Sequence, residues 1–240
     1  NGFASRTTSR IQNDLLELTA QYTNRFNQHS INALAGYSWT NYNYQYAYME
    51  NRDFSTDDYN WNNMGQGAGL QKGTAAMNTT QNSNRLVGYF ARANYNYADR
   101  YFLSASIRYE GSSKFGADHK WGAFPAVSGA WNIANEGFFK QVKPISTLKL
   151  RAGYGVTGTV PGSSYMSLSR LDMGGYGYYK GEWIKQLKPG GNSNPDLRWE
   201  KKKEFNVGLD FGFLNDRING SIDYYHRTTD DLIWDYSVPV

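Results

Sequence analysis

Apolar and polar residues alternate along most of this chain. Between Leu16 and Phe26, apolar side chains occupy nearly every second position and polar side chains stand between them. Because neighbouring side chains of a β-strand point to opposite faces of a sheet, this period of two predicts strands with one apolar and one polar face. Few windows show the 3.6-residue period of an amphipathic helix. Eight stretches carry the pattern, namely 11–26, 31–48, 87–97, 101–110, 121–133, 147–157, 197–213 and 218–227.

The links between these strands fall into short and long ones. Four are short (27–30, 98–100, 134–146 and 214–217), and the link at 134–146 has room for a single helical turn. Two are long, at about 49–84 and 158–195. Short links join antiparallel neighbours. The chain is therefore predicted to be all-β, with an antiparallel up-and-down sheet whose two ends face different surroundings.

Aromatic residues gather near the predicted strand ends. The chain holds 20 Tyr, 12 Phe and 7 Trp in 240 residues, yet its mean hydropathy is −0.70. Two aromatic bands with aliphatic residues between them are typical of a transmembrane β-barrel, because amphipathic rings settle at the two membrane interfaces. Charges on the alternate face would be costly in a dry core but cheap in a wet lumen. The residues that we expect at the lipid interfaces are Trp39, Tyr97, Tyr101, Tyr109, Trp131 and Tyr154.

Composition excludes several other classes. A chain with 16% aromatic residues is not disordered, and no window approaches the roughly 18 apolar residues of a spanning helix. The absence of Cys removes disulfides and thiolate chemistry, and leaves the redox compartment open. A net charge of +4, spread along the chain, argues against a nucleic-acid partner. Residues 1–10 do not resemble a signal peptide, so we expect either a cytosolic chain or an internal part of a longer precursor.

Several blocks of the sequence, together about half the chain, resemble one family. They are GYFARANYNYADRYFLSASIRYEGSSKFG (88–116), WGAFPAVSGAWNI (121–133), LKLRAGYGVTG (148–158) and NPDLRWEKKKEFNVGLDFGFLNDRINGSIDYYHRTTDDLI (194–233). In this order they are similar to the barrel of SusC/RagA-type TonB-linked outer-membrane proteins. The resemblance implies location in the bacterial outer membrane and import of oligosaccharides or peptides through a plugged barrel. It also implies TonB as the energy source and a SusD-like surface lipoprotein as the lid.

The chain departs from that family's complete pattern. We find no plug domain, TonB box or terminal barrel strand in the 240 residues, and eight strands fall short of the roughly 22 of plugged outer-membrane transporters. We therefore expect residues 1–240 to form one partial barrel, about eight strands of a larger one, in which TonB is reached through a plug outside this segment.

No motif supports an enzyme, a cofactor or a metal site. Gly153, Gly155 and Gly158 match a dinucleotide-binding fingerprint, but no helix is predicted after them to receive a phosphate. The three histidines stand far apart, without the spacing of metal ligands. Acidic residues cluster in loops without a calcium-loop pattern, so solvated loops are favoured there (Asp53, Asp57 and Asp58; Asp230, Asp231 and Asp235).

Aromatic residues in the long links are the candidate substrate contacts. Flat rings on a loop can stack on sugars or clamp an extended peptide, and they can equally pack on neighbouring loops or on the lid protein. Both interpretations stay open, as does the choice between sugar and peptide. The candidates are Trp61, Tyr176, Tyr178, Tyr179 and Trp183.

Two alternatives to the importer remain. One is a soluble or surface-attached β-rich carbohydrate-binding module, whose sheet would pack on protein instead of lipid. The other is a passive porin or structural outer-membrane protein, which shares the barrel but lacks coupling to TonB.

Overall fold

The computed structural model describes residues 2–58, 61–139, 141–142 and 144–234. The chain divides into two compact units, one made of residues 1–15 and 40–85 and the other of residues 16–39 and 86–240. We describe each unit by itself.

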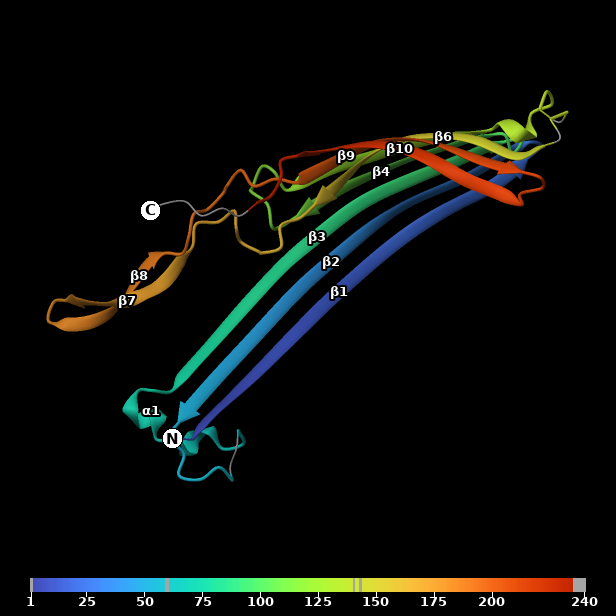
Figure 1. Cartoon of the computed structure of the whole chain (residues 1–240). Coiled ribbons are helices and arrows are strands. Elements are labelled where there is room, and N and C mark those ends of the chain that lie inside the picture. Colours follow the sequence, from blue (N-terminus) through green and yellow to red (C-terminus); the bar gives the residue numbers. More distant parts are fainter. Residues whose placement is uncertain (1, 59–60, 140, 143, 235–240) are drawn as a thin grey trace. The chain divides into compact units, whose positions relative to one another are not determined.

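Eight strands form one sheet in the order β1-β2-β3-β4-β5-β6-β9-β10, and β7 and β8 form a separate hairpin. Neighbouring strands from β3 onward are antiparallel, and Figure 1 shows β4, β6, β9 and β10 in one layer, seen nearly edge-on. Since β1 and β10 are the two edges, the sheet is open. The all-β, up-and-down architecture of eight main strands is thereby confirmed. The strands are β1 (Phe3–Phe26), β2 (His29–Arg52), β3 (Ala76–Tyr97), β4 (Tyr101–Ser112), β5 (Trp121–Asn132), β6 (Ile145–Thr159), β7 (Leu171–Tyr179), β8 (Glu182–Pro189), β9 (Glu200–Phe213) and β10 (Ile218–Asp230).

Helical structure among the described residues is limited to single turns. These are η1 (Met64–Gln66), α1 (Gly69–Lys72) and η2 (Ile133–Asn135), the last of which lies at the start of the link where one turn was predicted. No helix in the described part of the chain has the length and apolar character needed to cross a membrane.

The two long links are shorter than predicted. The link predicted at 49–84 is confined to 53–75, because β2 continues to Arg52 and β3 begins at Ala76. The link predicted at 158–195 is not a continuous loop either, since β6 continues to Thr159 and the β7–β8 hairpin lies within it. Strand extensions that are polar on both faces carry no alternation, which explains the first error.

Buried apolar side chains of the larger unit gather at the end of the sheet near the long links. Phe115, Phe124, Leu197 and Trp199 form this aromatic core. Gly116 donates its N–H to the Leu197 carbonyl at 3.0 Å, and a Cβ on Gly116 would lie 1.7 Å from the Pro195 oxygen. The Trp199 indole donates to the Lys120 carbonyl at 2.9 Å. The β4–β5 link is thus fixed against the segment before β9.

The smaller unit is organised around one buried amide. The Asn51 side chain is 1% exposed and donates to the carbonyls of Met64 and Gly67 at 2.7 and 2.8 Å. Its oxygen accepts the N–H of Arg52 at 2.8 Å. The 53–75 link is therefore folded back on the end of β2.

Candidate functional site

An inner aromatic row crosses the apolar face of the sheet beside the short turns. Its rings follow one another from β1 to β5, with centroids 5.0 Å apart for Phe26 and His29, 4.9 Å for His29 and Tyr97, 6.4 Å for Tyr97 and Tyr101, and 6.4 Å for Tyr101 and Trp131. The last three rings are directly paired across the strands. Three of the predicted interface residues are thus brought together, and His29, one of the histidines without the spacing of metal ligands, joins them.

An outer aromatic row crosses the same face toward the long links. Tyr37 contacts Tyr89 at 5.3 Å, Tyr89 contacts Trp121 at 6.3 Å, and Tyr109 stacks on Trp121 at 4.9 Å. Tyr109, a predicted interface residue, belongs to this row. Trp39, another of them, stands two residues beyond Tyr37 on β2 and is half-buried.

The same two rows continue on β6 and β9. Tyr154 pairs with Phe205, and Phe213 lies at the short-turn end of β9. The spacing between rows is constant: eight residues separate Tyr89 from Tyr97, Tyr101 from Tyr109, and Phe205 from Phe213. Between the rows the apolar face is aliphatic and exposed, as at Leu103, Ile107, Val127 and Ile222.

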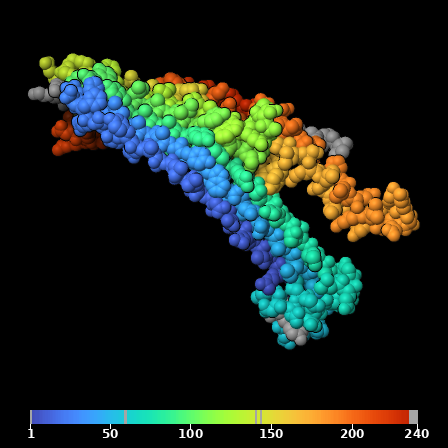
Figure 2. Space-filling model, turned by 180° about the vertical axis from the view of Figure 1, so that it is seen from behind, coloured from blue at the N-terminus to red at the C-terminus, as the bar shows by residue number. Residues whose placement is uncertain are grey.

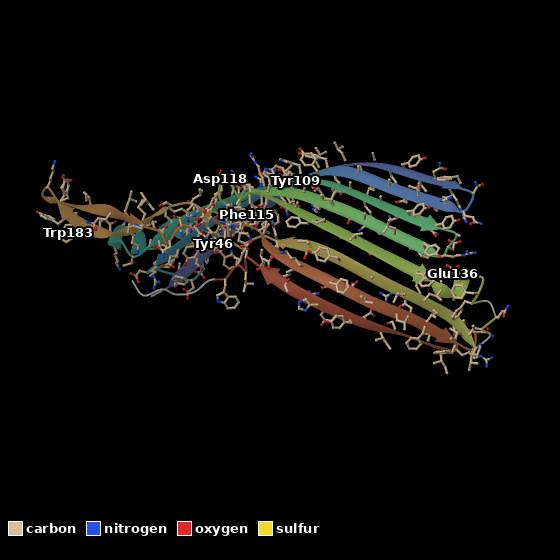
Figure 3. The ribbon with its side chains drawn as sticks, turned by 90° about the horizontal axis from the view of Figure 1, so that it is seen from above. Tyr46, Tyr109, Phe115, Asp118, Glu136 and Trp183 are labelled. Carbon is tan, nitrogen blue, oxygen red and sulfur yellow. The ribbon has the colours of Figure 1, made fainter. Side chains whose placement is uncertain are left out.

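Glu136, which the sequence did not single out, ties the inner row together. Its carboxylate accepts the Tyr101 hydroxyl at 2.6 Å and the Trp131 indole N–H at 3.1 Å, and lies 3.4 Å from the Arg100 guanidinium. These hydrogen bonds, from Tyr101 first, lower the pKa of Glu136 below its usual value. Figure 3 shows Glu136 at the turn end of the sheet, with Tyr109 toward the other end.

The opposite face carries charge arranged in pairs. The Arg151 guanidinium contacts Asp210 through two nitrogens at 2.9 and 2.7 Å and Asp223 at 3.0 Å. Farther along, the Arg227 guanidinium reaches Glu204 at 2.8 Å. The side chain of Arg151 stays 37% exposed. We call this the polar face; the charges of Arg151 and Arg227 are paired there but remain in contact with solvent.

The β7–β8 hairpin gathers four of the predicted substrate contacts. Cross-strand pairing places Tyr176, Tyr178 and Trp183 on one face, whereas Tyr179, opposite Glu182, lies on the other. The four rings are 57–68% exposed, and the Tyr178 and Trp183 centroids are 5.5 Å apart. Figure 2 shows the hairpin surface in orange, and Figure 3 labels Trp183. The fifth candidate, Trp61, is 56% exposed and belongs to the smaller unit.

The motifs that were set aside occupy structural positions. Gly153, Gly155 and Gly158 lie inside β6 rather than before a helix. His29 bonds the Tyr95 hydroxyl at 2.7 Å. Among the described residues, no three His, Cys, Asp or Glu side chains are grouped as metal ligands; Asp235 of the C-terminal acidic cluster lies outside those residues.

The known proteins that this chain resembles in sequence include several TonB-dependent receptors. The sequence model of the family described as TonB dependent receptor-like, beta-barrel matches residues 1–239. The TonB-dependent receptor SusC of Bacteroides thetaiotaomicron is 41% identical over 160 residues, which cover 65% of this chain and 16% of that protein. The TonB-dependent receptor P3 of Formosa agariphila is 32% identical over 227 residues, which cover 95% of this chain and 22% of that protein.

Solved structures agree. A structure described as that of the RagAB peptide transporter superposes with a TM-score of 0.87 at 26% identity, over 98% of this chain and 25% of that one. The chain thus spans about a quarter or less of the length of these relatives. The resemblance carried by the sequence blocks is confirmed, and the chain belongs to the TonB-dependent receptor-like β-barrel family, of the SusC/RagA type.

Proposed function

We propose that this chain forms part of the barrel wall of a TonB-dependent nutrient importer in the bacterial outer membrane. The parent protein would take up oligosaccharides or peptides together with a SusD-like lipoprotein, and would draw energy from TonB through a plug outside this segment. The observation that carries the proposal is the sheet itself. One face is aliphatic between two aromatic rows, and the other is charged and wet.

The aromatic rows also support a tilted, membrane-spanning sheet. Tyr101 is level with Leu209 along the ladder through Trp131 and Leu150, but the inner row on β9 lies four residues farther on, at Phe213. The outer row is offset equally, since Phe205 is level with Ala105 and not with Tyr109. Four residues rise about 13 Å and three strand spacings measure about 14 Å, so the rows run at roughly 40° to the ladder. Membrane barrels tilt their strands by about 35–45°.

The depth of the aliphatic band fits as well. Eight residues at that tilt span about 20 Å, close to the apolar band of roughly 25 Å in outer-membrane barrels. The two rows, including Tyr97, Tyr101, Trp131, Tyr109 and Tyr154, would then lie at the two lipid interfaces. Trp39 would stand just beyond the outer one.

The polar face would line the lumen. Ion pairs such as Arg151 with Asp210 would be expensive in a dry interior and cost little beside water. A soluble carbohydrate-binding module would have to cover the aliphatic face with protein instead, and the described sheet has nothing on that face between its two rows.

The rings of the β7–β8 hairpin and Trp61 would contact cargo or the lipoprotein at the cell surface. Rings that are more than half exposed offer stacking surface for sugars or for peptide side chains, and Tyr176, Tyr178 and Trp183 share one face for that purpose. The same face could seat the lipoprotein lid, and mutation separates the two roles.

Uptake by cells tests the proposal. Cells that depend on the full-length receptor should accumulate an oligosaccharide or a peptide only when TonB is present. Equal uptake without TonB would indicate a passive porin and contradict coupling. Replacing Trp183 by Ala should weaken binding of cargo to the receptor alone if it touches cargo, and should weaken only capture of the lipoprotein if it seats the lid.

A further inference from the structure

A cavity of about 900 Å³ opens outside the sheet, at the long-link end of the larger unit. Three separate segments line it, 165–170, 190–198 and 231–234. Its volume falls at the upper end of the roughly 300–1,000 Å³ typical of small-molecule sites. It is distinct from the hairpin rings and from the polar face.

The walls of the cavity are held by hydrogen bonds. The N–H of Asn194 donates to the Met166 carbonyl at 3.0 Å, and that of Gly190 donates to the Arg170 carbonyl at 2.8 Å. The third wall is fixed by Glu200, whose buried carboxylate accepts the Ile233 N–H at 3.1 Å. The cavity is therefore formed before any ligand arrives.

The lining combines a flat ring with charged groups, of which Arg198 donates to the Asp196 carbonyl at 3.2 Å and the Asp196 carboxylate lies 3.6 Å from His119. Trp234 is one of the lining residues of the cavity and is 75% exposed. Within the described residues, no ion pair or hydrogen bond engages the Arg170 guanidinium. Arg170 and Arg198 balance Asp196 and Asp231 in charge. A lining of this kind suits a ligand that has many hydroxyls and no net charge.

One residue of the rim is held in an unusual conformation. Tyr165 has a φ of 66°, in the left-handed region that residues other than glycine rarely adopt. The Leu168 N–H closes the turn by donating to the Tyr165 carbonyl at 3.1 Å. Such backbone strain tends to cluster at ligand clamps and active sites.

We propose that this cavity binds a neutral oligosaccharide, as a recognition site at the outer rim of the barrel. The Trp234 indole would stack on the apolar face of a sugar ring, and Arg170 would donate in a fork to neighbouring hydroxyls. A peptide fits less well, because bound peptides usually pair through their backbone and the wall N–H groups of Gly190, Asn194 and Ile233 are already used. This inference rests on the importer proposed above.

Calorimetry on the full-length receptor in detergent tests the site. The probes are maltotetraose, cellotetraose and xylotetraose, with tetra-alanine as the peptide. At least one tetrasaccharide should bind, and Trp234→Ala and Arg170→Met should each weaken it about tenfold. Phe138→Ala and Arg217→Met are the matched controls, since both residues lie at the short-turn end, and they should leave affinity unchanged.

Three results would contradict oligosaccharide binding in this cavity. They are no binding of any tetrasaccharide, binding that neither variant weakens, and tighter binding of tetra-alanine that both variants weaken. Uptake distinguishes this failure from that of the importer. If TonB-dependent uptake continues while the variants bind sugar normally, the importer proposal is supported and the proposal of a sugar site in the cavity is refuted. If sugar binding depends on Trp234 but no uptake requires TonB, the sugar site in the cavity is supported and the importer proposal is refuted.

Discussion

Leu150 is the position at which the tilt of the sheet makes the sharpest prediction. It is level with Tyr101 and Trp131 along the ladder, so in an untilted sheet it would stand at the membrane boundary with them. The two rows shift by four residues over the three strand spacings from β4 to β9. Because β6 lies two spacings from β4, the boundary there is shifted by about two thirds of that amount. Leu150 then lies about 7 Å inside the inner boundary of a layer about 20 Å deep, roughly a third of the way across.

The cost of a charge at Leu150 follows from that depth. An Arg on the lipid face of a barrel costs about 2–4 kcal/mol at the midplane and about 0–1 kcal/mol near the interfaces. We therefore expect Leu150→Arg to destabilise the barrel by about 2 kcal/mol or more, and Ala105→Arg, midway between Tyr101 and Tyr109, to cost at least as much, up to about 4 kcal/mol. Ser104→Arg is the matched control, because Ser104 neighbours Ala105 but bonds Asn94 on the polar face.

Guanidinium titration of the full-length receptor in lipid vesicles measures these differences, with the folded form followed by its gel mobility. Ser104→Arg should change the free energy of unfolding by less than about 1 kcal/mol, as expected of a surface position. If Leu150→Arg cost no more than this control, either the tilt or the assignment of the aliphatic face to lipid would be wrong.

Three further predictions concern single contacts. Arg151→Met should cost less than about 1 kcal/mol, because its pairs with Asp210 and Asp223 meet water, whereas a dry site would lose roughly 3–5 kcal/mol in the same titration. Trp199→Ala should remove about 3–5 kcal/mol of local stability, seen as hydrogen exchange at 115–124 that is at least about a hundredfold faster; unchanged exchange would contradict the core. The lowered pKa of Glu136 means that its contribution is complete above the ordinary Glu value of about 4.3 and lost as pH falls through the lower folded value. Measured against the intrinsic exchange rate at each pH, protection of the amides at 133–139 should thus fall in the unchanged protein as pH drops below the ordinary Glu value. Glu136→Gln should show the same low protection at every pH, and a pH-dependent protection that survives Glu136→Gln would refute this role.

Strands were predictable from the sequence where one face is apolar and the other is polar. On β4, alternation from Tyr101 to Tyr109 placed both the strand and its faces correctly. The outer ends of β1 and β3 have no such constraint, so polar residues stand on both faces and the period disappears. Residues 3–10 and 76–86 were missed for that reason.

The β7–β8 hairpin was hidden by a change of register. Pairing shifts between Met173 and Tyr176, where the two residues Gly174 and Gly175 stand opposite the single residue Gln186, so that β7 has one extra residue. One face of β7 therefore carries odd-numbered residues before the shift, Leu171 and Met173, and even-numbered residues after it, Tyr176 and Tyr178. A search for a constant period of two fails across such a shift. The rings were recognised as candidates, but their arrangement on two faces was not.

Contacts between distant segments could not be inferred from one sequence. Glu136 reaches Tyr101 across 35 positions, and the cavity near Trp234 needs three segments that only the folded chain brings together. Spacing rules detect motifs within a strand or a turn. They do not detect a carboxylate whose partners belong to other strands.

Solvent accessibility at two adjacent pairs of residues tests the central claim most directly. Cysteines or spin labels at Ala93 and Leu150 of the full-length receptor should contact lipid, whereas labels at the neighbouring Asn94 and Arg151 should meet water. That result would establish an aliphatic face in the membrane and a polar face in the lumen. Reversed accessibility, or water at all four positions, would contradict the account.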